Sequence, residues 1–445
     1  MADVRIRMYR QGLGDCFLLT FPGDRSPAHV LVDSGVLLGT PDAAAKMKAV
    51  AEDVVAETGG TLDVLIATHE HWDHLSGFVQ AQDVWDTLDV REVWLAWTED
   101  PTDELARELR QKRERAKHAI AAASRTLAEA EDPRAEPLDG VLGFFGALGA
   151  DGGGSTADAL EWVKGKRPTP RYLRPGEVLE ELGVRVFVLG PPHDIKLIKR
   201  SDPSTRTPEV YHLADAGPDL GLLAAIEGLD DPAETRRQPF VPWYRLSDEE
   251  ARAEPLFSDC YDAEDLEWRR IDQEWLGSAG PLALKLDSDT NNTSLALAFE
   301  LSDGGPVLLF PGDAQVGNWL SWGSVQFAGA DQVTSRDLLA RTVLYKVGHH
   351  ASHNATMREQ GLELMTSREL AAMIPVDREM AKKKKWNMPF PPLFKRLNEM
   401  ALGRVLDAEK GLVGTRPDAL GEKQWKDFTD RVDVQDGWID YRVRL

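Results

Sequence analysis

The hydrophobic pattern of the N-terminal part predicts strands followed by a helix. Apolar and basic residues alternate over residues 4–9, and short apolar runs at 17–21 and 29–33 complete a predicted antiparallel meander. Residues 42–58 then carry apolar positions at helical spacing. The next run, LDVLIA at residues 62–67, is too short for a helix and apolar apart from Asp63. Such a run is typical of a strand buried on both faces of a sheet.

Strand patterns continue along the chain but are interrupted by two segments of different composition. The first is a charged helix with a glycine-rich stretch, and the second is rich in proline and aspartate. We interpret both as insertions, because strand patterns return after each of them. The predicted division is a core segment at 1–100, a helical insertion at 101–166, a core strand segment at 167–194, a cap-like insertion at 195–284 and a second core segment at 285–445.

A βαβ-like step surrounds the buried strand at residues 62–67. We predict a helix after Gly77 and then a strand at residues 90–97. This order places THEHWDHLSG, residues 68–77, at the carboxyl end of its strand. Functional sites of α/β proteins collect at such strand ends. We therefore expect this segment to carry the chemistry.

This segment carries four side chains of the metal-ligand type in a stretch of six residues, namely His69, His71, Asp73 and His74. Their nitrogen and oxygen donors suit zinc, manganese or iron. In a turn, residues two apart can face one pocket, so His69 with His71 could hold one ion while Asp73 with His74 holds a second, with a hydroxide between them. A solvated histidine-rich loop is the alternative, but four such residues directly after a buried strand disfavour it.

Two later strand ends carry further donors. Asp313 follows Gly312 at the end of a predicted strand, and its carboxylate could bridge two ions. A turn aspartate is the simpler interpretation of Asp313 alone, but its place between two histidine-bearing strand ends favours a ligand. His349 and His350 end the predicted strand at 342–353. Since adjacent side chains of an extended segment point to opposite faces, we predict His350 as the ligand and His349 as a group that faces the substrate or supports the ligands from behind.

The stretch THEHWDH resembles the signature of the metallo-β-lactamase superfamily. This resemblance implies an α/β fold, the αββα four-layer sandwich, in which two sheets face each other, helices lie outside and the metal site lies at strand ends along one edge. The predicted fold is this sandwich with two helical or irregular insertions. The resemblance also implies that Asp33 supports the histidine loop, since a ligand histidine needs an acceptor on its other ring nitrogen. A turn-forming aspartate is the alternative.

The resemblance further implies a third histidine for the first ion, in a middle motif. His193 is the candidate by order along the chain, because it follows a predicted strand and precedes Asp313. Its context, GPPHD, differs from the glycine-histidine-threonine context of many members. The alternative is an exposed loop histidine. In that case the first ion is held loosely by His69 and His71, or only one ion binds tightly.

A particular branch of the superfamily is also suggested. NNTSLALAF and LLFPGD, followed by YKVGHHAS, resemble the hydrolase domain of the DNA-uptake protein ComEC and its free-standing relatives, as does the opening GLGDCFLLTF. The resemblance covers roughly residues 1–100 and 285–360. The sequence departs from this branch at His71, where aspartate is frequent, and at Ala351, where glycine is typical.

This branch implies phosphodiester hydrolysis, in which two ions polarise the phosphate and lower the pKa of a bridging water to about 7. Asp73 would orient the attacking hydroxide, and His349 is the second catalytic candidate. Polar groups on neighbouring strand ends are expected behind the ligands or at the substrate, although they could instead satisfy strand-end backbone groups or provide an edge charge. Together with Asp33, these residues are Asn291, Asn292, Ser294, Lys346 and Ser352.

Composition narrows the class of protein further. The chain of 445 residues carries a formal net charge of −22, which argues against broad, nonspecific binding to nucleic acids or membrane surfaces. Its two cysteines indicate no disulfide framework, and we find neither a signal-peptide pattern nor a run of about 18 apolar residues. We therefore expect a soluble cytoplasmic protein with no membrane partner. The sequence leaves the oligomeric state open.

Three functions remain, of which a metal-dependent phosphodiesterase or nuclease is favoured. The alternatives are a hydrolase of a small ester, lactone, thioester or amide, and a non-catalytic, metal-binding regulatory protein. The enzyme would act on a phosphodiester or small-molecule substrate with two divalent ions, zinc being favoured and manganese or iron also compatible. The charged helix at residues 102–131 is a possible surface for a protein partner, and the basic run at 381–386 for a polyanion, but both could equally be solvated.

Overall fold

The computed structural model describes residues 3–23, 26–129, 132, 134–146, 154–200, 254–255 and 279–445. Contacts between residues divide the chain into two units. The first, called the sandwich unit below, comprises residues 1–111, 143–214 and 287–445, and the second comprises residues 112–142 and 215–286. Most of the predicted cap-like insertion at 195–284 lies outside the described residues. The predicted domain boundaries stay predictions.

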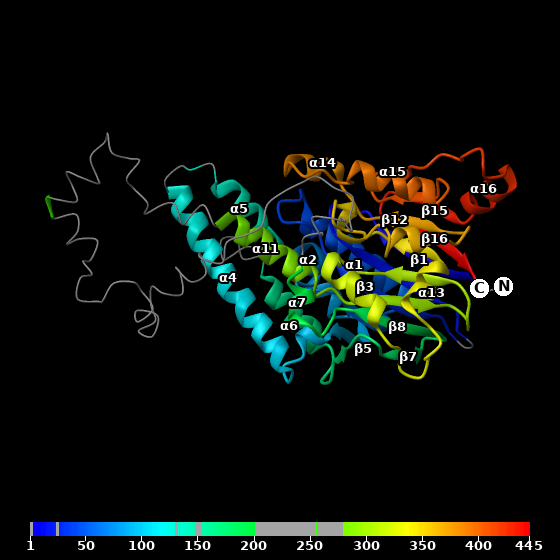
Figure 1. The fold of residues 1–445 in the computed structure, drawn as a ribbon, viewed down its shortest axis with the longest axis horizontal. Helices are drawn as coiled ribbons and strands as arrows, with labels where there is room; N and C mark the ends of the chain where they lie inside the picture. The colour runs from blue at the N-terminus through cyan, green and yellow to red at the C-terminus, as the bar shows by residue number, and fades with distance from the viewer. Residues whose placement is uncertain are drawn as a thin grey trace. The chain divides into compact units, whose positions relative to one another are not determined.

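The first sheet of the sandwich unit has eight strands (Figure 1). Four antiparallel pairings join five strands from the two ends of the sequence, and parallel pairing begins where the third strand of the predicted meander meets the buried strand LDVLIA. In sheet order these strands are β15 (Val432–Val434), β16 (Trp438–Arg444), β1 (Asp3–Tyr9), β2 (Cys16–Phe21), β3 (Ala28–Ser34), β4 (Thr61–Ala67), β5 (Asp89–Ala96) and β6 (Arg171–Leu173).

The second sheet also has eight strands. Its central strands β10 to β13 pair in parallel, and antiparallel strands flank them on both sides. In sheet order they are β14 (Gly411–Leu412), β13 (Val405–Asp407), β12 (Ala371–Ile374), β11 (Thr342–Lys346), β10 (Val307–Phe310), β9 (Ala296–Glu300), β8 (Val184–Gly190) and β7 (Val178–Glu181).

The two sheets face each other across one hydrophobic core. Buried residues of both sheets form a single cluster, in which the rings of Phe17 and Phe310 meet edge to face with centroids 5.6 Å apart. A second cluster packs the other face of the first sheet against α1 (Ala43–Thr58), α2 (Trp72–Gln80) and α6 (Thr156–Gly165). On the second sheet, α12 (Val316–Ser321) contacts β8, and α13 (Ser335–Ala340) contacts β10. The result is a sandwich of two sheets between helices.

The remaining helices of the described residues are short, apart from the predicted charged helix, which is observed as α4. They are α3 (Gln82–Trp85), α4 (Glu104–Glu129), α5 (Ala135–Leu142), α7 (Ile195–Ile198), α11 (Ala279–Asn291), α14 (Arg378–Lys383), α15 (Pro391–Met400) and α16 (Glu422–Thr429), with 3₁₀ turns at η1 (Trp97–Glu99), η2 (Gly143–Phe145), η7 (Trp322–Ser324), η8 (Gly348–Ala351) and η9 (Leu362–Leu364). Among the helices that the structure describes, none is long and apolar enough to cross a membrane.

Two predicted boundaries are wrong at the positions that carry the candidate chemistry. The helix that we predicted after Gly77 begins at Trp72, so Asp73 and His74 lie in its first turn. The strand predicted at 342–353 ends at Lys346. His349 and His350 follow in a turn with φ values of 45° and 51°, the left-handed region that non-glycine residues seldom adopt.

Candidate metal centre

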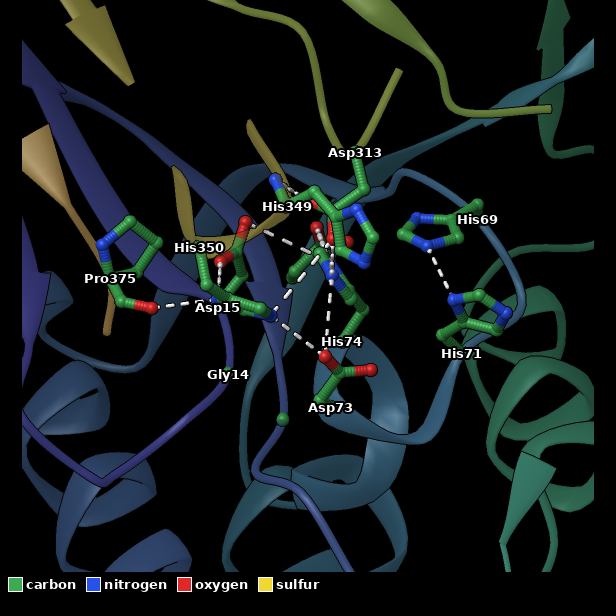
Figure 2. Close-up of polar contacts among 12 residues, drawn as sticks. Gly14, Asp15, His69, His71, Asp73, His74, Asp313, His349, His350 and Pro375 are labelled. Atoms are coloured by element: carbon green, nitrogen blue, oxygen red, sulfur yellow. Dashed lines mark hydrogen bonds and ion pairs between the residues drawn. The ribbon is translucent and has the colours of Figure 1, made fainter. Parts of the chain in front are cut away.

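The ends of four strands bring the predicted ligands together. The histidine loop follows β4, Asp313 follows β10, and His350 follows β11, while Asp15 immediately precedes β2. Figure 2 shows the rings of His69 and His71 together on one side of the site and His350 with Asp15 on the other. Because β2 and β4 belong to the first sheet and β10 and β11 to the second, strand ends of both sheets meet at this site.

Four buried side chains form a compact group, called the four-donor cluster below: Asp73, His74, Asp313 and His350. Asp73 Oδ2 lies 2.9 Å from His350 Nε2, and Asp313 Oδ2 lies 3.2 Å from His74 Nε2. One donor atom from each residue lies within 4.8 Å of the others. Donors bound to one ion at about 2.0–2.2 Å lie roughly 3–4 Å from one another, so this geometry suits a single divalent ion.

The far sides of both cluster histidines are held by hydrogen bonds. His350 Nδ1 lies 2.7 Å from the carbonyl oxygen of Pro375, and His74 Nδ1 lies 2.8 Å from Asp33 Oδ2. The Asp33 carboxylate also accepts the backbone N–H of Thr68 at 2.8 Å and its hydroxyl at 2.7 Å. Since each Nδ1 is engaged, each Nε2 faces the other donors as a potential ligand. Asp33 thus lies behind the histidine loop, where the family resemblance places it.

Asp313 offers one carboxylate oxygen to the cluster because the protein engages the other. Its Oδ1 accepts the backbone N–H of His349 at 2.8 Å and the ammonium of Lys346 at 3.1 Å. Lys346 also donates to the Gly312 carbonyl at 3.0 Å and forms an ion pair with Asp15. The predicted edge charge is therefore a buried cation between two carboxylates. Charge pairing on both sides compensates the cost of burying it.

Asp15 is a site residue that our sequence reasoning did not select. Its carboxylate lies 3.8 Å from His74 Nδ1, and its backbone N–H donates to the Asp73 carbonyl at 2.9 Å. Gly14 has φ of 154°, and a Cβ atom at this position would lie 2.7 Å from the same carbonyl. The Gly-x-Gly-Asp pattern of GLGDC therefore reflects close contact with the histidine loop, and it was the signal that could have identified Asp15.

The other two motif histidines form a separate pair, called the His69/His71 pair below. His69 Nε2 lies 3.0 Å from His71 Nδ1, and the rings of His69 and His74 are 4.2 Å apart, so the pair adjoins the four-donor cluster. Thr68 Oγ1 lies 3.1 Å from His69 Nδ1. In the part of the chain that the structure describes, no third histidine, cysteine or acid forms a metal-type group with this pair.

The donor set fits a bound cation. Among the buried side-chain atoms that make no hydrogen bond with the described protein atoms, these lie at or beside this site: Asp15 Oδ1, His71 Nε2, Asp73 Oδ1, His74 Nε2 and Asp287 Oδ1. Buried polar atoms without partners cost free energy and are rare in folded proteins. A divalent ion would satisfy those that face the cluster.

The electrostatics of the site favour the neutral, metal-binding form for two of its histidines. Burial, together with neighbouring His74, lowers the pKa of His69 well below its usual value, and burial lowers that of His71 to about 3. Both rings are therefore neutral at pH 7, the form that binds metal. Burial also opposes the charged form of His74, but Asp313 and other acids raise its pKa strongly. Burial and the charges of Asp73 and Asp313 raise the pKa of the Asp287 carboxyl to about 8.

Residues 10–167 match the model of the metallo-beta-lactamase superfamily. The match includes the histidine motif and supports the resemblance drawn from THEHWDH. The two sheets between helices are consistent with the fold of this superfamily, as predicted. Its members are mostly hydrolases and typically bind divalent metals, which supports an enzyme with a metal site. None of the curated proteins compared with the chain matches it.

The third histidine expected from the superfamily is not brought to the other ligands. His193 Nε2 lies 2.9 Å from Asp103 Oδ2, its ring packs 4.3 Å from that of Trp97, and its side chain is 44% exposed. Arg174 donates to the same carboxylate at 2.7 Å. This position corresponds to the alternative of a loop histidine paired at the surface.

His349 and His350 differ in their surroundings, but not because the segment is extended. Its turn is stabilised by the hydrogen bond from the His349 N–H to Asp313. His349 Nδ1 lies 2.8 Å from Ser352 Oγ and 3.4 Å from Gln315 Nε2, while His350 joins the four-donor cluster. Burial lowers the pKa of His349 to about 4, so this ring is neutral at pH 7.

The asparagine and serine residues preceding β9 mainly hold the backbone. Asn292 donates to the carbonyls of Ile198 and Arg200, each at 3.0 Å, and its Oδ1 accepts backbone N–H groups. Ser294 Oγ accepts the N–H of Asp313 at 3.0 Å. Asn291 Nδ2 lies 3.3 Å from Asp287 Oδ2. For Asn292 and Ser294, the structure therefore favours the backbone role that we considered as the alternative.

Proposed function

We propose that the chain is a hydrolase with two divalent metal ions, zinc first among them, and that its substrates are phosphodiesters. The observation that carries this proposal is the four-donor cluster adjoining the His69/His71 pair. Bound divalent ions lower the pKa of water and polarise a phosphoryl oxygen. Nitrogen and carboxylate donors are the ligands that such ions take in hydrolytic sites.

The chain's own residues would orient the attacking water. Asp73 directs Oδ2 toward His350 and the cluster, whereas its Oδ1 is buried and makes no hydrogen bond. In this proposal Oδ1 accepts a hydrogen bond from the water and fixes its direction of attack. Lys346 and the His349 backbone hold the bridging candidate Asp313 by its far oxygen, so that Oδ2 remains directed at His74 and would be available to a bound ion.

His349 would act at the substrate. Ser352 Oγ donates to Asn354 Oδ1 at 2.8 Å, so its hydroxyl proton is engaged there. His349 Nδ1 has two contacts, Ser352 Oγ at 2.8 Å and the amide donor Gln315 Nε2 at 3.4 Å. In this proposal the shorter contact sets the tautomer, so that the imidazole proton lies on Nδ1 and Nε2 is left as an acceptor. A neutral imidazole with an unprotonated Nε2 can accept a proton or a hydrogen bond from water or substrate.

The surroundings of His71 support a substrate that carries both a negative charge and an aromatic ring. Its ring lies 5.4 Å from that of Phe144, which stacks on Trp386 with centroids 5.1 Å apart and planes at 15°. Trp386 directly follows the four lysines at residues 382–385. The chain has a net charge of −22, so a dense basic run is unusual in it. Because this run is followed directly by the Phe144–Trp386 stack beside His71, it favours a phosphate with an attached ring as substrate.

The Phe144–Trp386 stack would also suit a small apolar acyl group, so the test compares phosphodiesters with thioesters and lactones. Metal content by plasma mass spectrometry is measured together with hydrolysis of bis-p-nitrophenyl phosphate, a thioester and a lactone. The variants are Asp73→Ala and, as a control, Asp303→Asn at an exposed acid that pairs with Arg185. About two ions per chain and phosphodiester cleavage lost only in Asp73→Ala are expected. Turnover of the thioester or lactone alone would overturn the phosphodiesterase assignment, and a protein that binds no metal would overturn the hydrolase.

A further inference from the structure

Asp287 of α11 lies beside His71, at the ring nitrogen that does not face His69. Asp287 Oδ1 lies 3.9 Å from His71 Nε2, and both atoms are buried without a hydrogen bond. The side chains are largely removed from solvent, with exposed fractions of 13% for Asp287 and 2% for His71. One helical turn later, Asn291 Nδ2 lies 3.3 Å from the other carboxylate oxygen, Oδ2. Asp287 is thus held at one oxygen while the other faces His71.

The geometry of the imidazole ring decides what Asp287 does there. His71 directs Nδ1 at His69 Nε2, 3.0 Å away, and the two nitrogens of an imidazole lie on different sides of the ring. An ion shared by His69 Nε2 and His71 Nδ1 therefore leaves the Nε2–H of His71 pointing away from it, toward Asp287. Asp287 is placed as the acceptor for this proton and not as a ligand of that ion.

Three other histidines of the site each have a hydrogen-bond partner at the ring nitrogen that points away from the other donors. His74 has Asp33 behind it, His350 has the Pro375 carbonyl, and His69 has the Thr68 hydroxyl, each at 3.1 Å or less. His71 is the histidine of this set whose far nitrogen makes no hydrogen bond, and it faces a carboxylate that also has an unpaired oxygen. A carboxylate behind a ligand histidine fixes its tautomer and raises its basicity.

The two ion positions also differ in the number of protein donors. The four-donor cluster offers two nitrogens and two carboxylate oxygens, whereas the pair offers two nitrogens, and His193 lies elsewhere. Because the His69/His71 pair has fewer donors, binding of an ion there depends more strongly on the orientation and basicity of each imidazole. We propose that Asp287 is a positioning residue that accepts the Nε2 proton of His71 and thereby strengthens binding of the second ion at the His69/His71 pair. This inference rests on the metal site of the proposed function and deepens it.

The test titrates metal into the full-length chain after chelation. Zinc and cobalt are added to wild type, Asp287→Ala, Asp287→Asn and Asp287→Glu, and binding is followed by calorimetry, by bound metal per chain and by the visible spectrum of cobalt. In wild type the first equivalent fills the four-donor cluster and the second fills the pair. In Asp287→Ala the second equivalent should bind 10–100-fold more weakly while the first is unchanged. Asp287→Asn should lie between these, and Asp287→Glu should restore binding.

Asp303→Asn serves as the control, since it makes the same carboxyl-to-amide change in an exposed turn and should leave both equivalents unchanged. An unchanged second equivalent in Asp287→Ala would overturn this inference and leave the proposed hydrolase standing. Equal weakening of both equivalents, with a fall in Tm of the chelated protein, would assign Asp287 a merely structural role and overturn it as well. A wild type that binds no ion would instead overturn the proposed function.

Discussion

Asp33→Asn tests how strongly one buried acceptor controls the metal centre. Asp33, the penultimate residue of β3, has φ of 58°, a left-handed conformation that asparagine tolerates as well as aspartate. The substitution therefore changes the acceptor without a new backbone conflict. It leaves one carbonyl oxygen to serve three donors, namely the Thr68 N–H, the Thr68 hydroxyl and His74 Nδ1.

The magnitude follows from the bonds that are lost. Oδ2 accepts from Thr68 Oγ1 at 2.7 Å and from His74 Nδ1 at 2.8 Å, and an amide nitrogen at this position cannot accept either proton. Two hydrogen bonds to a charged acceptor contribute about 1.5–3 kcal/mol each, so the chelated protein should lose about 3–6 kcal/mol of unfolding free energy. His74 would also move its proton to Nε2, which faces Asp313, and metal affinity should fall about 10–100-fold.

Urea unfolding of the chelated protein and zinc titration measure the two effects separately. Asp42→Asn is the matched control, because Asp42 has φ of 54°, is exposed and makes no side-chain capping hydrogen bond. It should change both quantities by less than about 0.5 kcal/mol. If Asp33→Asn bound zinc like wild type, the argument that Asp33 orients His74 would be wrong.

Four further outcomes are expected. His193→Ala should retain the full metal content, because His193 contacts Asp103, and the loss of one ion by plasma mass spectrometry would restore it as a ligand. Lys346→Met should lower the unfolding free energy of the chelated protein by about 3–5 kcal/mol, because it leaves Asp15 and Asp313 buried without their cation, and a loss below about 1 kcal/mol in urea would contradict this. Trp386→Ala should raise KM for bis-p-nitrophenyl phosphate more than it lowers kcat, and the reverse split would place the stack in catalysis rather than binding. Chelation should lower the Tm of wild type and zinc should restore it, since an ion at 1,000 times its Kd stabilises the fold by about 4 kcal/mol; an unchanged Tm would mean that no ion binds tightly.

Much of the sandwich was predictable from local sequence, because its strands are short apolar runs with clear boundaries. LDVLIA is buried and pairs in parallel on both sides, as its largely apolar pattern indicates. The start of α2 was missed, since the motif residues 68–77 are both ligand-rich and helix-forming, and composition alone does not separate a loop from a helix with Asp73 in its first turn. The turn at His349 and His350 depends on a hydrogen bond to Asp313, which the local sequence does not show.

In the candidate site too, some residues could be identified from the sequence and others could not. His69, His71, Asp73 and His74 are recognisable by their density, and the order of strand ends pointed to Asp313 and His350, which the structure brings beside Asp73 and His74. Whether these residues bind metal stays a prediction. Asp287 carried no local signal, because it lies in a helix without a motif and becomes relevant only through its contact with a residue more than 200 positions earlier.

The pairing of β1 with β16 sets a minimum time for completing the first sheet (Figure 1). Arg7 and Asp440 face each other across these strands although they are 433 positions apart. At about 5–20 residues per second, the ribosome needs roughly 20–90 s to make the chain between them. During that interval β2 to β5 can already pair, but one edge of β1 has no neighbour. Arg5 and Arg7, which later form ion pairs with Asp440, then place charge on that open edge and disfavour its pairing with another nascent chain.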